Sequence, residues 1–155
     1  MSPTFVHLRL HTEYSLIDSV VRVADLMDAV GAAGMPAVAL TDQCNLFAMV
    51  KFYRAALDRG VQPIIGVDLL LNEADEKHGP SRLTLLCQNL GGYQNLARLV
   101  SRAFLEGQTA AAVPLVDRAW LDRRSFNPLR SWLSGALRWG LPGETVVCES
   151  GAEDA

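Results

Sequence analysis

The sequence predicts an α/β fold, and two observations carry that prediction. Short apolar or alternating runs occur at residues 5–10, 37–41, 63–71 and 82–87, and stretches with helical spacing lie between most of them. Strands that alternate with helices are typical of βα units, which assemble into a parallel sheet or barrel. The chain has 155 residues, half of them hydrophobic, and this is long enough for one domain with a substantial core.

The first half of the chain contains the clearest elements. Residues 5–10 (FVHLRL) alternate in character, as a strand with two different faces does. A predicted helix follows, and its apolar stripe consists of Val23, Leu26, Met27 and Val30. Residues 37–41 (AVALT) are apolar almost throughout, which predicts a strand buried on both faces of a parallel sheet.

Two more helices and two more strands complete the predicted fold. The helix after the second strand begins at Asn45, the expected N-cap, and its expected core stripe consists of Leu46, Val50, Tyr53 and Leu57. Strands at 63–71 and 82–87 come next, joined by the polar stretch 72–81, which reads as an exposed loop and includes His78. The stripe of the last helix consists of Tyr93, Leu96, Val100 and Phe104.

Composition limits the classes of function. The formal net charge is −3 and no block of like charge occurs, so tight electrostatic binding of nucleic acid by this chain is not expected. The three cysteines, Cys44, Cys87 and Cys148, are odd in number and far apart, which argues against a disulfide framework and fits a reducing cytoplasm. No signal peptide and no membrane span are indicated, so we expect a soluble cytoplasmic protein without membrane partners.

Polar side chains gather near the predicted strand ends. His7, Arg9 and His11 are spaced two apart and therefore share one face of an extended segment. Asp42 follows the second strand and Asp68 lies late in the third. Two imidazoles and two carboxylates that met there would suit zinc, manganese or iron. The alternative is that each side chain only satisfies local hydrogen bonds.

Several motifs follow one another in a recognisable order. They are FVHLRLHTEYSLIDS, ALTDQCNLFAMVKFYRAA, GVQPIIGVDLLL and GGYQNLARLVSRAF. This arrangement resembles the polymerase-and-histidinol-phosphatase (PHP) domain of bacterial replicative DNA polymerase III α subunits. The resemblance implies a partial PHP domain at residues 1–121, the first half of a (β/α)7 barrel with parallel strands. Residues 122–155 would then form a divergent, irregular and poorly ordered tail.

The sequence departs from the family at the metal site. The family's His-x-His motif would fall at positions 9 and 11, and its Thr-Asp-His motif at 41–43, but Arg9 and Gln43 stand where two histidines are expected. The resemblance therefore implies a vestigial pocket without metal or catalytic residues, formed by His7, Arg9, His11, Asp42, Gln43 and Asp68. Because a guanidinium cannot donate a lone pair to a metal, we expect Arg9 to pair with Asp42 or Asp68 and supply the missing positive charge. If a metal did bind, its ligands would be His7, His11, Asp42 and Asp68.

Some neighbours of this pocket have two interpretations. Thr12, Tyr14 and Ser15 could contact a phosphate, but turn and cap hydrogen bonds explain the threonine and serine equally well. Glu13 is expected to be a solvated carboxylate. Cys44 could be taken for a nucleophile or a ligand, although a buried free cysteine is the stronger expectation.

The resemblance implies a function through the parent protein. Such a parent is a DNA-directed DNA polymerase (a nucleotidyltransferase) that uses Mg²⁺ in a palm domain, and none of the motifs above belongs to that domain. This chain would be an inactive scaffold without a cofactor, with the rest of the α subunit and the proofreading exonuclease as partners, and it would meet DNA only through the parent. The alternatives are a phosphoesterase or 3′–5′ exonuclease dependent on Zn²⁺ or Mn²⁺, and a non-functional truncated remnant. An incomplete barrel also predicts low stability or self-association of the chain alone.

Overall fold

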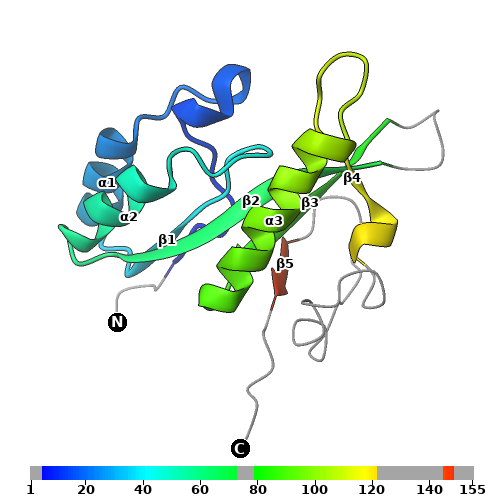
Figure 1. Cartoon of the computed structure of the whole chain (residues 1–155). Coiled ribbons are helices and arrows are strands. Elements are labelled where there is room, and N and C mark those ends of the chain that lie inside the picture. Colours follow the sequence, from blue (N-terminus) through cyan, green and yellow to red (C-terminus); the bar gives the residue numbers. More distant parts are fainter. Residues whose placement is uncertain (1–4, 73–78, 122–144, 149–155) are drawn as a thin grey trace, which may run out of the picture.

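The computed structural model describes residues 5–72, 79–121 and 145–148 (Figure 1). The helices are α1 (Val23–Ala32), α2 (Met49–Leu57) and α3 (Leu90–Glu106), with two short 3-10 helices, η1 (Glu13–Asp18) and η2 (Arg118–Leu121). The strands are β1 (Ala37–Leu40), β2 (Gln62–Asn72), β3 (Ser81–Cys87), β4 (Val116–Asp117) and β5 (Thr145–Cys148). The predicted mixed α/β class is confirmed.

The long strand β2 organises the sheet. Its first half pairs in parallel with β1, from Ala37 opposite Gln62 to Leu40 opposite Ile65. Its second half pairs antiparallel with β3, and its last two residues pair in parallel with β4. Strand β5 pairs in parallel with the far edge of β3, which gives the order β1-β2-β3-β5. Strand β2 therefore belongs to a parallel pair in its first half and to an antiparallel pair in its second half.

The prediction that all strands run parallel is wrong for β2 and β3. Only residues 73–80 separate these strands, and a parallel crossover requires a dozen or more residues, so the chain turns back as a hairpin. Residues 73–78 of the predicted polar loop, including His78, lie outside the described residues. The described strands form an open sheet, and closure into a (β/α)7 barrel stays a prediction.

The prediction of a regular strand at residues 5–10 is also wrong. This segment runs beside β1 but forms only one bridge, between His7 and Val38. Farther along, the side chain of Thr41 replaces a regular ladder: the Leu10 amide donates to Thr41 Oγ1 at 2.8 Å, and the Thr41 amide donates to the Leu10 carbonyl at 2.9 Å. The segment nevertheless stays extended, and it brings Arg9 and His11 to Asp68 of β2.

The two helices that pack near β1 show one correct and one wrong prediction. All four stripe residues predicted for α1 are buried, and Met27 is fully so. In α2, however, Val50, Tyr53 and Leu57 of the predicted stripe face outward, and Phe52 and Ala56 form the buried face together with Ala48 before the helix. Leu46 lies before the helix and is half-buried against the core between α3 and the hairpin of β2 and β3. Burial of Phe52 contributes about 1.5–3 kcal/mol. The small alanines on either side of it allow α2 to approach the core closely.

The expected cap of α2 is likewise corrected. The helix begins after Ala48, and no side chain caps it. Asn45 instead stabilises the preceding turn, where its Oδ1 accepts from the Phe47 amide at 3.0 Å and its Nδ2 donates to the carbonyls of Tyr14 and Gln43. An asparagine bonding to the backbone two residues on is an Asx turn, which competes with helix capping for the same side chain.

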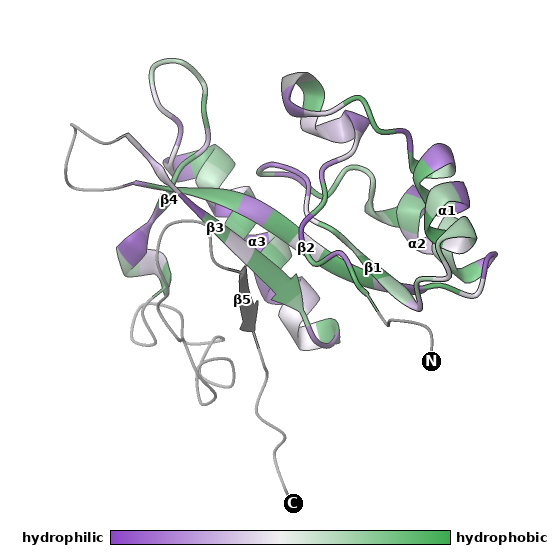
Figure 2. Ribbon diagram, turned by 180° about the vertical axis from the view of Figure 1, so that it is seen from behind, coloured by the Kyte–Doolittle hydropathy of each residue, from purple (hydrophilic) through white to green (hydrophobic). Residues whose placement is uncertain are grey.

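A second core lies between α3 and the hairpin of β2 and β3. Asn89 caps α3 by accepting from the Gly92 amide at 2.9 Å. Of the predicted stripe, Leu96 and Val100 are buried, whereas Tyr93 is half-buried and Phe104 is exposed. Leu99 and Ala103 complete the packed face. Figure 2 shows mainly hydrophobic residues along β1, β2 and β3, and α3 lies behind β2 and β3 in this view.

Little of the predicted tail can be placed. Residues 122–144 and 149–155 lie outside the described residues, including Trp132 and Trp139, and only β5 is described. Trp120 lies just before the tail, in η2, and the Arg102 guanidinium stacks over its ring at 4.2 Å from the centroid. This cation–π contact joins η2 to α3.

Candidate functional site

Asp68 is the centre of a buried polar network. The carboxylate is 2% exposed, and its Oδ2 accepts from Arg9 Nε at 2.6 Å and lies 2.8 Å from His11 Nε2. Its Oδ1 accepts from the hydroxyl of Thr84, which stands directly opposite Asp68 on β3. Three donors from two separate segments therefore converge on one side chain of β2.

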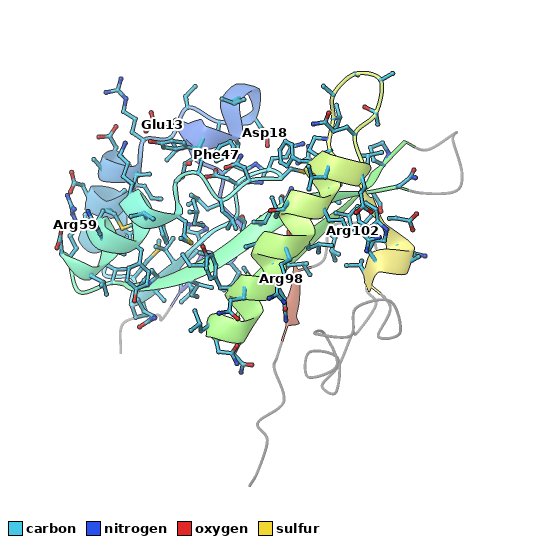
Figure 3. The ribbon with its side chains drawn as sticks, in the orientation of Figure 1. Glu13, Asp18, Phe47, Arg59, Arg98 and Arg102 are labelled. Atoms are coloured by element: carbon cyan, nitrogen blue, oxygen red, sulfur yellow. The ribbon has the colours of Figure 1, made fainter. Side chains whose placement is uncertain are left out.

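The network continues toward the surface through His11. Its Nδ1 is hydrogen-bonded to Asp18 at the end of η1, so the imidazole bridges two carboxylates. Arg82 of β3 reaches within 4.0 Å of the same Asp18 carboxylate. His11, Asp18 and Arg82 line an open cavity of about 440 Å³. Figure 3 labels Asp18, together with Glu13, at the end of the molecule where η1 lies. The network joins the N-terminal segment, η1, β2 and β3.

Asp42 organises a second buried cluster beside the first. The side chain is fully buried, and its carboxylate accepts from the Thr12 amide at 2.6 Å, from the Thr12 hydroxyl at 2.8 Å and from the Ser15 hydroxyl at 2.8 Å. Thr12 is also the N-cap of η1, and Ser15 Oγ accepts from the Gln43 amide at 3.0 Å. The cap interpretation is confirmed for Thr12, whereas the Ser15 hydroxyl makes hydrogen bonds to Asp42 and Gln43, which are distant in sequence.

The pKa values follow from these contacts. Burial alone would raise the pKa of Asp68, but hydrogen bonds from His11, Thr84 and Arg9 outweigh burial and hold this pKa below its ordinary value. The hydrogen bond to Asp68 raises the pKa of His11, and Asp18 adds to this effect against the opposing effect of burial. The two pKa shifts run in opposite directions, and both favour the charged forms, as expected for an imidazolium paired with carboxylates.

Protein stability should depend on pH through this pair. His11 contributes fully to the free energy of unfolding below its unfolded-state pKa of about 6.5. This contribution is lost as pH rises through the raised folded-state pKa. The contribution of Asp68 is complete above about 3.9 and is lost as pH falls through its lowered pKa. We expect the thermal midpoint to be highest between about pH 4 and 6.5 and to fall toward alkaline pH.

Thermal melts of single variants check this expectation. His11→Gln should flatten the alkaline fall, because no imidazolium then pairs with Asp68. His7→Gln is the matched control, since His7 is exposed and its ring contacts Phe5 instead of the Asp68 network. An unchanged alkaline fall in His11→Gln would assign the pH dependence to other groups.

The structure separates the six residues predicted for the pocket. Arg9, His11 and Asp68 share one network, and the Asp68 amide donates to the Asp42 carbonyl at 3.2 Å, which places the Asp42 cluster next to it. Gln43 is half-buried and forms a backbone bridge with Asp68. His7 lies apart: it is exposed, and its ring makes an edge contact with Phe5 at 4.7 Å.

Two neighbouring residues match their simpler interpretation. Glu13 is partly exposed, and its carboxylate lies 3.4 Å from Lys51 Nζ, as a solvated surface carboxylate does. Cys44 is buried and forms no disulfide, and burial raises the pKa of its thiol, which disfavours the nucleophilic thiolate.

The sequence did not point to three members of the network: Asp18, Arg82 and Thr84. Thr84 could have been found only with the hairpin register, because it is the residue opposite Asp68. Arg82 lies on the same strand, two residues earlier, and therefore on the same face. Asp18 carries no signal of its own, since a lone aspartate near a serine is common in turns.

The model of the PHP domain family matches residues 7–137, and the chain belongs to that family. The DNA polymerase III subunits alpha of Pseudomonas fluorescens and Pseudomonas aeruginosa are each 49% identical over 121 residues, which is 78% of this chain. The resemblance based on the sequence motifs is therefore confirmed. The chain spans about a tenth of the length of these relatives.

An amidohydrolase from Chromobacterium violaceum, solved with bound sulfate and no metal, aligns with 64% of this chain and 34% of its own, at 17% identity and a TM-score of 0.48. Among the described residues, no helix is both long and apolar enough to cross a membrane.

Proposed function

We propose that this chain is a structural PHP module of a replicative polymerase α subunit, in which an arginine-centred ion network replaces a metal site. The observation that carries the proposal is the 2.6 Å hydrogen bond from Arg9 Nε to the buried Asp68 carboxylate. Arg9 stands at the position where the sequence motif of metal-binding relatives places a histidine. The proposal assigns no hydrolytic step to this site.

The available donor atoms do not fit a bound metal ion. Both imidazole nitrogens of His11 are already hydrogen-bonded to carboxylates, and His7 lies outside the network. The Asp42 carboxylate is directed at three donors from Thr12 and Ser15. Within the described ranges, no group of three or more histidine, cysteine, aspartate or glutamate side chains could hold a metal. A metal would have to break several of these hydrogen bonds.

Arg9 supplies the positive charge that the buried Asp68 carboxylate requires. A carboxylate that is 2% exposed is costly unless it is paired and hydrogen-bonded. The Arg9 guanidinium provides a permanent positive charge, and protonated His11 adds a second one. This pairing supports the interpretation that the pocket now fixes the N-terminal segment against β2 and no longer binds substrate.

Membership of the family and the proposed loss of metal support the proposed scaffold role. The relatives are α subunits about ten times longer than the matched region, so the rest of such a subunit is the first partner that we propose. The proofreading exonuclease is the second partner, and DNA would be reached only through the polymerase. Mg²⁺ would belong to the polymerase palm and not to this chain.

Two assays test the proposal together. We expect the purified chain to leave p-nitrophenyl phosphate and single-stranded DNA intact when Mn²⁺ or Zn²⁺ is added. We also expect immobilised chain to retain the proofreading exonuclease of Pseudomonas aeruginosa. Metal-dependent hydrolysis that disappears in Asp68→Asn would instead establish a phosphoesterase or nuclease. Absence of both hydrolysis and exonuclease binding would favour a non-functional remnant.

A further inference from the structure

Two of the three cysteines occupy paired positions on neighbouring strands. Strand β5 runs parallel to β3, and the register places Cys148 opposite Cys87 (Figure 1). Each cysteine is the last residue of its strand. Residues 88–147 lie between them in the sequence, so it is the fold that brings the two positions together and not a local motif.

The spacing of paired strands suits a disulfide bond. Neighbouring strands lie about 4.8 Å apart, and a disulfide joins residues whose Cα atoms are about 4.4–6.8 Å apart. Paired positions also share one face of a sheet. Cys87 and Cys148 form the last pair of the register, so a small backbone adjustment at this end disturbs no pair after them.

Cys87 can be reached by a reagent from solvent. It is partly buried at the border of the core between α3 and the hairpin, and it lines an open cavity of about 520 Å³ between α2 and α3. Cys44 differs, because it is buried and its Sγ lies 3.7 Å from the Pro114 carbonyl oxygen. The odd number of cysteines thus divides into one pair and one buried residue.

From this register we propose that Cys87 and Cys148 form a reversible disulfide when a low-molecular-weight disulfide such as glutathione disulfide is present. The Cys87 thiolate attacks one sulfur of glutathione disulfide, which forms a mixed disulfide and releases one glutathione thiolate. The Cys148 thiolate then attacks the Cys87 sulfur, and the second glutathione leaves. Two cysteine thiols are oxidised, one glutathione disulfide is reduced to two thiols, and the two protons pass to the glutathiones.

The disulfide would fasten β5 to the edge of β3. The unpaired backbone groups of an edge strand can pair with another chain, so a covalently held β5 keeps this edge covered. In a reducing cytoplasm the disulfide is transient and follows the state of the glutathione pool. We expect the oxidised chain to melt at a higher temperature than the reduced chain, because the bond closes a long loop. The pair goes beyond the proposed scaffold role and does not rest on it.

Disulfide mapping of the full chain in glutathione redox buffers tests the inference. The folded chain is equilibrated with mixtures of reduced and oxidised glutathione, alkylated under denaturing conditions, digested with trypsin and analysed by mass spectrometry. We expect one cross-link, which joins peptides 83–98 and 139–155 and leaves Cys44 alkylated. Against reduced glutathione, this cross-link should be roughly tenfold or more stable in the folded chain than in concentrated urea, because the register holds the two cysteines together.

Variants separate the register from random oxidation. Cys44→Ala is the matched control and should form the same cross-link, whereas Cys87→Ser should form none. The double variant Val146→Pro, Val147→Pro removes at least one β5 amide that pairs with β3, since alternate residues of a strand donate to the same neighbour. Its cross-link should be only as stable as that of the unfolded chain, while circular dichroism shows that the rest of the chain is folded.

Three results would overturn the inference. The first is a cross-link that is equally stable in the folded chain and in urea, because the register would then contribute nothing. The second is a cross-link in the folded chain that includes Cys44 or joins two chains. The third is a cross-link that keeps its full stability in the folded proline variant, since pairing of β5 with β3 would then not hold Cys148 beside Cys87.

Discussion

Asp42→Ala is expected to lower the free energy of unfolding by about 3–5 kcal/mol, because it removes a fully buried acceptor of three hydrogen bonds. The Thr12 amide and hydroxyl and the Ser15 hydroxyl would then be buried without their acceptor. Since Thr12 caps η1, we also expect the turn that carries Asp18 to loosen. Chemical denaturation with urea measures the change.

A surface aspartate provides the matched control for this experiment. Asp28→Ala removes an exposed carboxylate whose contact is Arg59 on the surface, and exposed ion pairs contribute little. The loss in free energy of unfolding for Asp42→Asn should lie between those of Asp42→Ala and Asp28→Ala. The amide oxygen of asparagine can still accept one hydrogen bond, but its amide nitrogen would face another donor. If Asp42→Ala were as stable as Asp28→Ala, the buried cluster would have no role in holding the N-terminal segment.

Gly66→Ala is expected to destabilise the chain by about 3 kcal/mol or more, through a backbone clash that rotamer changes cannot relieve. A Cβ atom at Gly66 would lie 2.5 Å from the Leu85 carbonyl oxygen and 2.6 Å from Cδ2 of Leu86. Gly66 is the first β2 residue of the hairpin register, so the clash falls where the strand leaves β1 and joins β3. We expect β2 and β3 to separate locally, which amide hydrogen exchange would detect.

Gly31→Ala is the control for Gly66→Ala. Gly31 lies in α1, with no atom within 4 Å of a Cβ built on it, and alanine is a better helix former than glycine by about 1 kcal/mol. We therefore expect Gly31→Ala to raise the thermal midpoint slightly. Equal and small effects of the two substitutions would contradict the close approach of β2 to β3.

The sequence predicted those elements whose buried face is also their most apolar face. In α1 the stripe that ends at Val30 is buried as expected, because one face of that helix is apolar and the other is not. In α2 the same reasoning failed, because alanines on the other face allowed a closer approach than the larger stripe of Tyr53 and Leu57. Periodicity reports how apolar a face is, and it does not report which face fits the neighbouring surface.

The candidate site could be predicted only where side chains share a local segment. Arg9 and His11 were expected on one face, and an ion pair with Asp42 or Asp68 was expected from charge; the structure pairs Arg9 with Asp68. Thr84 and Asp18 depend on a hairpin register and a turn that local pattern does not determine. The antiparallel direction of β3 could have been predicted, because the connection between the two predicted strands, residues 72–81, is shorter than a parallel crossover requires.

If Arg9 replaces the charge of a bound metal ion, as we propose, the purified chain should hold no metal at this site, and its metal content can be measured. Inductively coupled plasma mass spectrometry is applied to the wild-type chain and to the double variant Arg9→His, Gln43→His, each dialysed after exposure to Zn²⁺ or Mn²⁺. We expect the wild type to retain far less than one ion per chain and the double variant to retain more. One tightly held ion per wild-type chain, released by substitution of His11 or Asp68, would contradict it.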